Sequence, residues 1–161
     1  MKNLKERVII LQPYKVLTHK NYFYQFETET GAKYACYFLL YKEYFIDYPA
    51  VADNIYSFNV DLIGKAAKSE IDERIAITIV SILQSFLQGL QNAVVYICDS
   101  SDERHLLRKR KFNAWFHQYD DGTIIKVEAT AIIENMTLYN AILIHKDNKK
   151  EKSFYRSVSG F

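Results

Sequence analysis

The fold is decided by residues 72–98, which read DERIAITIVSILQSFLQGLQNAVVYIC. Apolar side chains recur in this stretch at the spacing of one helix face, at Ile75, Ile79, Ile82, Leu83, Phe86 and Leu90. The spacing predicts a long helix over 72–91, for which Ser69 and Asp72 both have N-capping chemistry. Residues 93–98 form a short apolar run of the kind found in central strands. We therefore expect a long helix that leads into a buried strand.

Residues with high strand propensity precede this helix. Strands are expected over 22–29, 33–41 and 55–63, and residues 7–17 have the pattern of a first strand or extended arm. Thr30-Gly31 supplies the turn of a hairpin, and Pro13 interrupts the first segment. A loop is expected around 47–49. The upstream part of the chain is therefore predicted to be mainly antiparallel sheet.

The segment after the central strand predicts a second helix and two more strands. Residues 99–102 have the composition of a turn and helix start, and Ser100 with Glu103 makes a capping box. A basic helix is expected to run to Lys111 or further. Asp120-Asp121-Gly122 is a turn signal. The rest of the chain is predicted as strands over 123–133 and 138–145 and a polar basic tail over 147–161, with room for a short helix.

The resulting order is β-β-β-α-β-α-β-β, which predicts the α+β class. One mixed, mainly antiparallel sheet with two principal helices on its faces is the simplest way to bury this pattern. The length of 161 residues suits a single domain over 1–161, with residues 1–20 as a possible N-terminal strand or arm.

The composition excludes several classes of protein. Since 49% of the residues are hydrophobic, the chain is not disordered as a whole. A net charge of +2 creates no broad field that would attract nucleic acid. Two cysteines, Cys36 and Cys98, and four scattered histidines predict neither a disulfide framework nor a metal site.

The sequence also predicts a cytoplasmic protein. The charged N-terminus leads into only four apolar residues, 8–11, which is too short for the core of a signal peptide. No segment reaches the length of about 18 apolar residues that a membrane span needs.

The densest positive stretch is residues 104–111 on the second helix. At helical spacing, Arg104, Arg108 and Lys111 share one face, which suits phosphates or the acidic surface of a partner. The candidate residues for binding an anion or a partner are Arg104, Arg108, Lys109 and Lys111. The alternative is a solvated basic face, balanced by the acidic residues within 99–103.

A weaker catalytic hypothesis concerns the end of the central strand. Ligands favour the carboxyl ends of strands in mixed sheets, and polar residues gather there in this sequence. Asp99 and His105 would serve as base and acid, and Arg104 would steady an anion. The alternative is helix capping by Ser100 or Asp102, which requires no chemistry.

Aromatic residues are concentrated between Tyr22 and Phe58, where 8 of the 13 Tyr and 5 of the 10 Phe lie. Aromatic sheet faces pack cores and protein interfaces, since Tyr combines apolar area with a polar tip. They also stack nucleic-acid bases. The pattern favours a core together with a protein interface or self-association through an aromatic sheet face, and nucleic acid is the alternative partner.

The stretch Tyr96-Ile97-Cys98-Asp99-Ser100-Ser101-Asp102, continued by Arg108, Lys111, Phe112 and Trp115-Phe116, resembles the signature of a family of small uncharacterised bacterial proteins, mainly from Bacteroidota. The family carries a domain-of-unknown-function label and no established activity. A role beside a toxin–antitoxin or phage-defence partner is one hypothesis that suits such a compact protein.

The order of elements is similar to that of the GCN5-related acetyltransferases. With Phe112 at the closing Phe of that family's second-helix pattern, Leu107 falls where a Tyr often serves as general acid. The resemblance implies that the N-terminus of the long helix grips coenzyme A, with glycines that let the backbone approach the pyrophosphate. Residues 72–77 contain no Gly and two carboxylates, which would repel a pyrophosphate.

Three functional hypotheses follow. The first is a binding or interaction module without enzymatic activity, whose basic helix faces an anionic partner. The second is a divergent acyltransferase-like enzyme that uses coenzyme A without the usual Gly-rich loop. The third is an RNA-binding protein or ribonuclease, for which Arg110 and His117 have the Arg-x6-His spacing of one class of helical ribonucleases.

Overall fold

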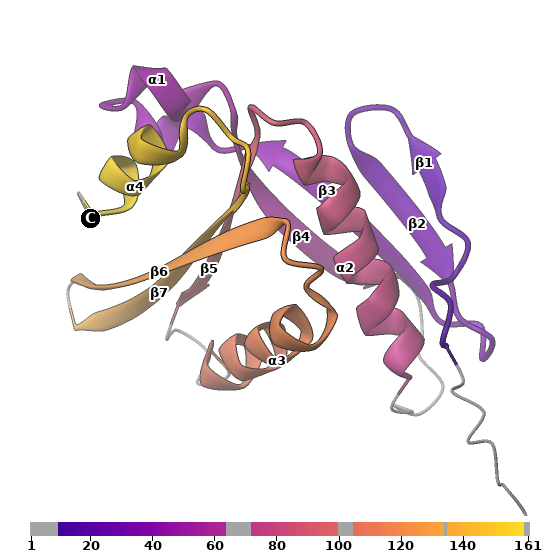
Figure 1. Cartoon of the computed structure of the whole chain (residues 1–161). Helices are drawn as coiled ribbons and strands as arrows, with labels where there is room; N and C mark the ends of the chain where they lie inside the picture. The colour runs from indigo at the N-terminus through magenta and orange to yellow at the C-terminus, as the bar shows by residue number, and fades with distance from the viewer. Residues whose placement is uncertain (1–9, 64–71, 100–104, 134, 160–161) are drawn as a thin grey trace, which may run out of the picture.

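Seven strands form one mixed sheet, and helices pack on both of its faces (Figure 1). The computed structural model describes residues 10–63, 72–99, 105–133 and 135–159. The strands are β1 (Leu17–His19), β2 (Phe23–Glu27), β3 (Lys33–Leu40), β4 (Ile55–Ile63), β5 (Ala93–Asp99), β6 (Ile124–Ile133) and β7 (Met136–His145). The helices are α1 (Pro49–Ala52), α2 (Glu73–Leu87), α3 (His105–Tyr119) and α4 (Glu151–Ser159), with a 3₁₀ turn, η1, at Lys42–Phe45. The predicted α+β class with one mixed sheet is confirmed.

The strand order is β1-β2-β3-β4-β5-β7-β6, and every pair is antiparallel except β4 with β5. Helix α2 connects these two parallel strands, as a parallel crossover requires. The two strands pair at only three positions: Ile55 with Ala93, Tyr56 with Val94, and Ser57 with Val95. Beyond Ser57, the rest of β4 pairs with β3 alone, and beyond Val95, the rest of β5 pairs with β7 alone. Strands β4 and β5 are therefore hydrogen-bonded near their N-terminal ends and separate towards their C-terminal ends.

Two hydrophobic cores lie on opposite faces of the sheet. Directly paired residues point to the same face of a sheet. The larger core contains Tyr56, Val94 and Leu143, covered by α2 and α3. Their neighbours Ile55, Ala93 and Ile144 point the other way, into a smaller core with side chains of η1, α1 and α4. Helix α2 contributes Phe86, whose ring stacks on Phe38 of β3 with a centroid distance of 3.8 Å.

Helix α2 ends earlier than the periodicity predicts, at Leu87 instead of residue 91. Gln88 is the C-cap, and a turn closes from Gly89 to Asn92, whose N–H donates to the Gly89 carbonyl at 2.9 Å. A Cβ on Gly89 would lie 2.8 Å from the side-chain nitrogen of Asn92, so a larger residue here would require the Asn92 side chain to shift. Leu90 is consequently 43% exposed and lies outside the core to which its spacing assigned it. The predicted N-cap Asp72 is confirmed; Ser69 lies outside the described residues.

Two short helical elements replace the loop expected around 47–49. Pro49 is the first residue of α1, where its missing N–H costs no helical hydrogen bond. Phe45 and Val51 are buried in the smaller core. At the other end of the chain, α4 buries Phe154 completely against the same core. Buried apolar side chains of both segments therefore pack in the smaller core, and α4 is the short helix for which the predicted tail had room.

The predicted turns are confirmed at two places. Gly31 has φ +87° between β2 and β3, and Gly122 has φ +81° before β6. Both values lie in the left-handed region that glycine adopts without strain. In the N-terminal segment, for which a first strand or an extended arm was expected, only Leu17–His19 pair with β2. Residues 10–16 run alongside without joining the sheet.

Candidate functional site

Helix α3 carries the predicted basic residues, but the structure describes them unequally. Arg104 lies outside the described residues, and Arg108 lies in α3 with a side chain that is outside the described part. Lys111 is exposed, and its ammonium lies 4.9 Å from the centroid of the Trp115 ring. Lys109 is half-buried. The predicted common face of Arg104, Arg108 and Lys111 therefore stays a prediction.

The inward side of α3 holds a compact charged cluster. Lys126 of β6 donates to Asn113 and lies 3.0 Å from the Glu128 carboxylate. This ammonium lowers the pKa of the Glu128 carboxyl, and Lys109 lowers it further. Lys126 also lies 5.3 Å from the centroid of the Phe116 ring. Two of the cations near α3 thus act on a carboxylate of the same chain, which reduces their attraction for an outside anion.

The outward side of α3 is a row of exposed side chains at helical spacing: Leu107, Arg110, Lys111, Ala114, His117 and Gln118. Arg110 and Lys111 are therefore the described cations of α3 that face solvent. The ribonuclease-like pair Arg110 and His117 lies in this row, two turns apart.

The catalytic candidates lie at the end of one element and the start of the next. Asp99 is the last residue of β5, and its Cα pairs with that of Leu138 in β7. His105 is the first residue of α3. Residues 100–104, which include the predicted capping box, lie outside the described part, and so do the side chains of both candidates. The hypothesis that Asp99 and His105 act as base and acid stays a prediction.

The N-terminus of α2 is closed by side chains of this chain. Asp72 accepts a hydrogen bond from the Arg74 N–H at 2.9 Å, and the Tyr14 hydroxyl donates to the same carboxylate. The Arg74 guanidinium lies 3.9 Å from the centroid of the Tyr14 ring and donates to Glu29 at 2.8 Å. Since a carboxylate already takes the Arg74 amide, this helix end offers no grip for a pyrophosphate of the kind that the acetyltransferase resemblance implies.

One half of the sheet has a face that no described helix covers. We call it the outer face of β1–β4, and the register assigns to it Leu17, His19, Phe23, Gln25, Glu27, Lys33, Ala35, Tyr37, Leu39, Ser57, Asn59, Asp61 and Ile63. None of these residues belongs to either core. The Phe23 and Tyr37 rings stack across the strands at a centroid distance of 5.9 Å. Leu39 is 54% exposed and Ile63 41%.

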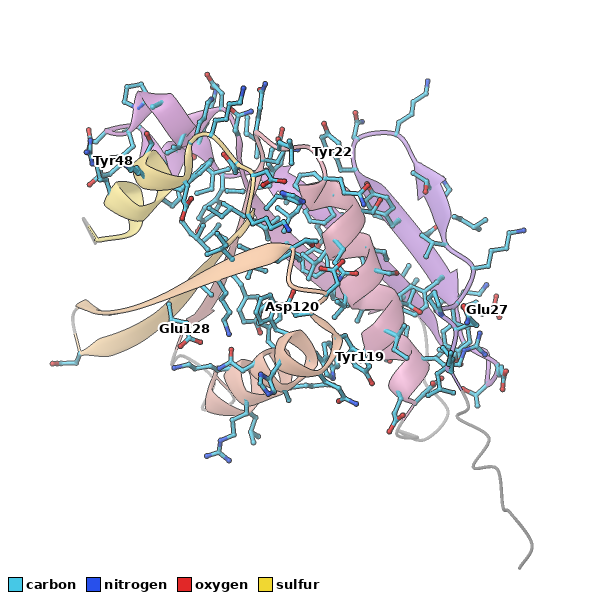
Figure 2. The ribbon with its side chains drawn as sticks, in the orientation of Figure 1. Tyr22, Glu27, Tyr48, Tyr119, Asp120 and Glu128 are labelled. Atoms are coloured by element: carbon cyan, nitrogen blue, oxygen red, sulfur yellow. The ribbon has the colours of Figure 1, made fainter. Side chains whose placement is uncertain are left out.

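A groove of about 640 Å³ lies where β1 leaves the sheet; we call it the edge groove. Its wall includes Tyr14, Phe26 and Tyr34, and Lys15 and Lys33 are at its rim. Figure 2 shows Glu27, which lines the groove, and Glu128 of the α3 cluster on opposite sides of α2. Sequence reasoning missed this site, because its walls come from β1, β2, β3 and α2. The sequence feature that could have indicated the groove is the concentration of aromatic residues between Tyr22 and Phe58, which was interpreted as a core together with a protein interface.

The comparisons with known proteins give one match. A model described as "Family of unknown function (DUF6169)" matches residues 71–159, more than half of the chain. The chain belongs to this family. No curated protein and no solved structure matches it. The resemblance to a family of unknown function is thus confirmed, while its occurrence in Bacteroidota and the acetyltransferase-like layout stay predictions.

The DUF6169 match runs from the start of α2 to the end of α4. It therefore includes the α3 cluster and the smaller core, while β1–β4 precede it. Of the groove-lining residues that the structure describes, only Arg74 falls within the matched segment. In the described part of this DUF6169 protein, no helix has both the length and the apolar character needed to cross a bilayer.

Proposed function

We propose that this chain is a non-enzymatic binding module that associates with a second copy of itself through the outer face of β1–β4. The observation that carries the proposal is the uneven covering of the sheet. Around β5 and β7, both faces are buried in hydrophobic cores, whereas β1–β4 contribute side chains to one core only, apart from Ile55. Exposed aliphatic and aromatic side chains on a sheet face are typical of an interface.

The outer face also has the charges that a self-complementary contact needs. In a twofold dimer, the same patch meets itself, so a patch with charges of a single sign would repel its copy. The outer face carries Glu27 and Asp61 together with Lys33, and all three are exposed. The apolar contacts would come from Phe23, Tyr37 and Leu39. Carboxylates of one copy would therefore meet ammonium groups of the other around an apolar centre.

Sedimentation velocity over a wide range of protein concentration tests the proposal. We expect a concentration-dependent dimer, and we expect Leu39→Ser to raise the dimer dissociation constant about tenfold or more. Leu107→Ser is the matched control, because Leu107 on α3 is 62% exposed and lies off the outer face. A wild-type protein that stays monomeric, or two variants with equal effects, would reject the proposal.

The same module would present the outward row of α3 to an anionic partner. The support is the exposure of Arg110 and Lys111. The matched family has no function attached, so the role beside a toxin–antitoxin or phage-defence partner stays a prediction.

The acyltransferase-like activity is a second proposal, supported by the parting of β4 and β5. After the two strands separate, Val60 and Leu62 of β4 point to the face that α2 covers, yet they are 39% and 45% exposed. Isothermal titration with acetyl-coenzyme A tests it: we expect binding that Leu62→Glu abolishes and Leu90→Glu leaves intact, since Leu90 is comparably exposed at 43%. If no heat is released at millimolar ligand, the proposal fails.

A further inference from the structure

The edge groove exists because the chain before β1 leaves the sheet. Strand β1 pairs with β2 at only three positions: Leu17 with Gln25, Thr18 with Tyr24, and His19 with Phe23. Upstream of Leu17, the chain crosses to α2, where the Tyr14 N–H donates to the Thr78 hydroxyl oxygen at 2.8 Å. The space that a longer β1 would fill is the groove, and its volume of about 640 Å³ is that of a small-molecule site.

Three aromatic rings form one wall of the groove in a nearly parallel series. Tyr14 and Phe26 have a centroid distance of 6.0 Å and an interplanar angle of 10°, and Phe26 and Tyr34 have 5.2 Å and 11°. Tyr14 and Phe26 are buried, so the wall is anchored in the larger core. The Arg74 guanidinium closes the Tyr14 end of the series, and Glu29 takes its charge. The wall is therefore apolar and fixed in place, and the half-buried Tyr34 is the ring of the three that a ligand can reach.

The backbone of Glu27 adds a polar edge to this wall. The Phe38 N–H donates to the Tyr22 carbonyl at 3.2 Å, and the Thr28 N–H donates to the Ala32 carbonyl at 2.9 Å. Because hydrogen-bonded pairs alternate along an antiparallel ladder, the odd-numbered residues of β2 turn their N–H and C=O groups away from β3. Gln25 meets Leu17 there, whereas Glu27 has no backbone partner among the described residues. Its N–H is a donor that a ligand oxygen can use.

The rim of the groove is positively charged. Lys15 and Lys33 are exposed, and their side-chain ammonium groups make no ion pair or hydrogen bond with any described residue. Since Arg74 and Glu29 neutralise each other, the Glu27 carboxylate is the remaining negative charge against these two ammonium groups. Two cations and a free backbone donor beside an apolar wall complement a carboxylate that is attached to a flat apolar group.

We propose that the edge groove binds a small aromatic carboxylic acid. Its ring lies along Tyr34, and its carboxylate lies between Lys15 and Lys33 and accepts from the Glu27 N–H. The site lies at the hairpin end of β2 and β3 and shares Glu27 and Lys33 with the proposed dimer contact, whereas Phe23, Tyr37 and Leu39 of that contact lie towards the other end.

Isothermal titration calorimetry with naphthoate tests the carboxylate, and naphthamide is its neutral counterpart. The titrations use the full chain and are repeated on Leu39→Ser, so that loss of self-association and loss of ligand binding are distinguished. We expect naphthoate to bind at least tenfold more tightly than naphthamide. Equal affinities, or no heat from either compound at millimolar concentration, would overturn the proposal.

Two variants locate the binding. Lys15→Gln with Lys33→Gln is expected to weaken naphthoate binding about tenfold or more while leaving naphthamide unchanged. Lys149→Gln with Lys152→Gln removes the same charge from exposed positions outside the groove and is expected to change neither. Leu17→Trp, which places a larger side chain at an exposed lining position, is expected to block both compounds. An equal effect of the two lysine pairs would overturn the proposal.

Discussion

The Tyr14 hydroxyl donates a hydrogen bond to the carboxylate of Asp72, 58 residues further along the chain. Asp72 is also the N-cap of α2, because its other oxygen accepts from the Arg74 N–H. Burial raises the pKa of the Tyr14 phenol, and the bond to Asp72 raises it further. One carboxylate thus joins the arm before β1 to the helix that covers the larger core, and it holds a wall of the edge groove in place.

A double-mutant cycle on Tyr14 and Asp72 should show that their contributions to the free energy of unfolding are coupled. We expect Asp72→Ala to lower the free energy of unfolding by about 1 kcal/mol for the lost cap, and Tyr14→Phe to lower it by a similar amount. The double variant should lose less than the sum, since either change removes the shared bond. Urea unfolding measures all four proteins. Asp72→Asn retains an N-cap and should lose less stability than Asp72→Ala. Strict additivity in the cycle would contradict the inferred link.

The conservative substitution Thr78→Val should lower the stability of the protein, because the buried Thr78 hydroxyl makes two hydrogen bonds. It is completely buried, donates to the Arg74 carbonyl at 2.6 Å and accepts from the Tyr14 N–H. Thr78→Val retains the shape but leaves that N–H without its acceptor, which costs about 1–3 kcal/mol. Thr18→Val, at an exposed position on β1, is the control and should be nearly neutral. Equal unfolding midpoints in urea would show that the bond contributes nothing.

The Cys36 thiol should be unreactive in the folded protein. It is completely buried, and burial raises its pKa from an ordinary value of 9.0 to about 12. A raised pKa in the folded state favours the protonated thiol, so its contribution to stability is complete below pH 9 and declines as the pH rises towards 12. In a Cys98→Ala background, a disulfide reagent at pH 8 should label Cys36 only as urea unfolds the chain. Fast labelling without urea would contradict the buried position.

The basic helix should bind anions through the three cations that helical spacing predicts on one face. In fluorescence anisotropy with a short labelled RNA, we expect replacement of Arg104, Arg108 and Lys111 by Gln to abolish most binding. The slope of log affinity against log salt should fall by about 2, because about 0.7 of a counterion is released per neutralised phosphate on a single strand. Gln at Lys42, Lys149 and Lys152, all exposed elsewhere, is the control. Unchanged binding and slope in the first variant would reject an anion-binding role for α3.

Local sequence patterns determined the elements with strong periodicity or turn chemistry. The spacing of Ile75, Ile79 and Ile82 predicted α2, and residues 93–98 predicted the central strand, because side-chain period follows from backbone geometry alone. Gly31 and Gly122 marked turns for the same local reason. Helix α1 has only four residues, too few for a helical period, so the region around 47–49 was interpreted as a loop, whereas the tail was given room for the short helix that α4 forms.

Only the tertiary structure decided which distant residues meet. Nothing in the local pattern around Tyr14 distinguishes an exposed arm from a segment that leaves the sheet and docks on Thr78. The edge groove follows from that departure, since its aromatic wall and its lysines come from different strands. The Glu27 N–H, which has no backbone partner in the described part of the chain, likewise depends on where β1 stops pairing. The period of apolar residues along one segment specifies which face of that element is buried. A site depends instead on contacts between elements, and these are determined by the arrangement that buries the most apolar area.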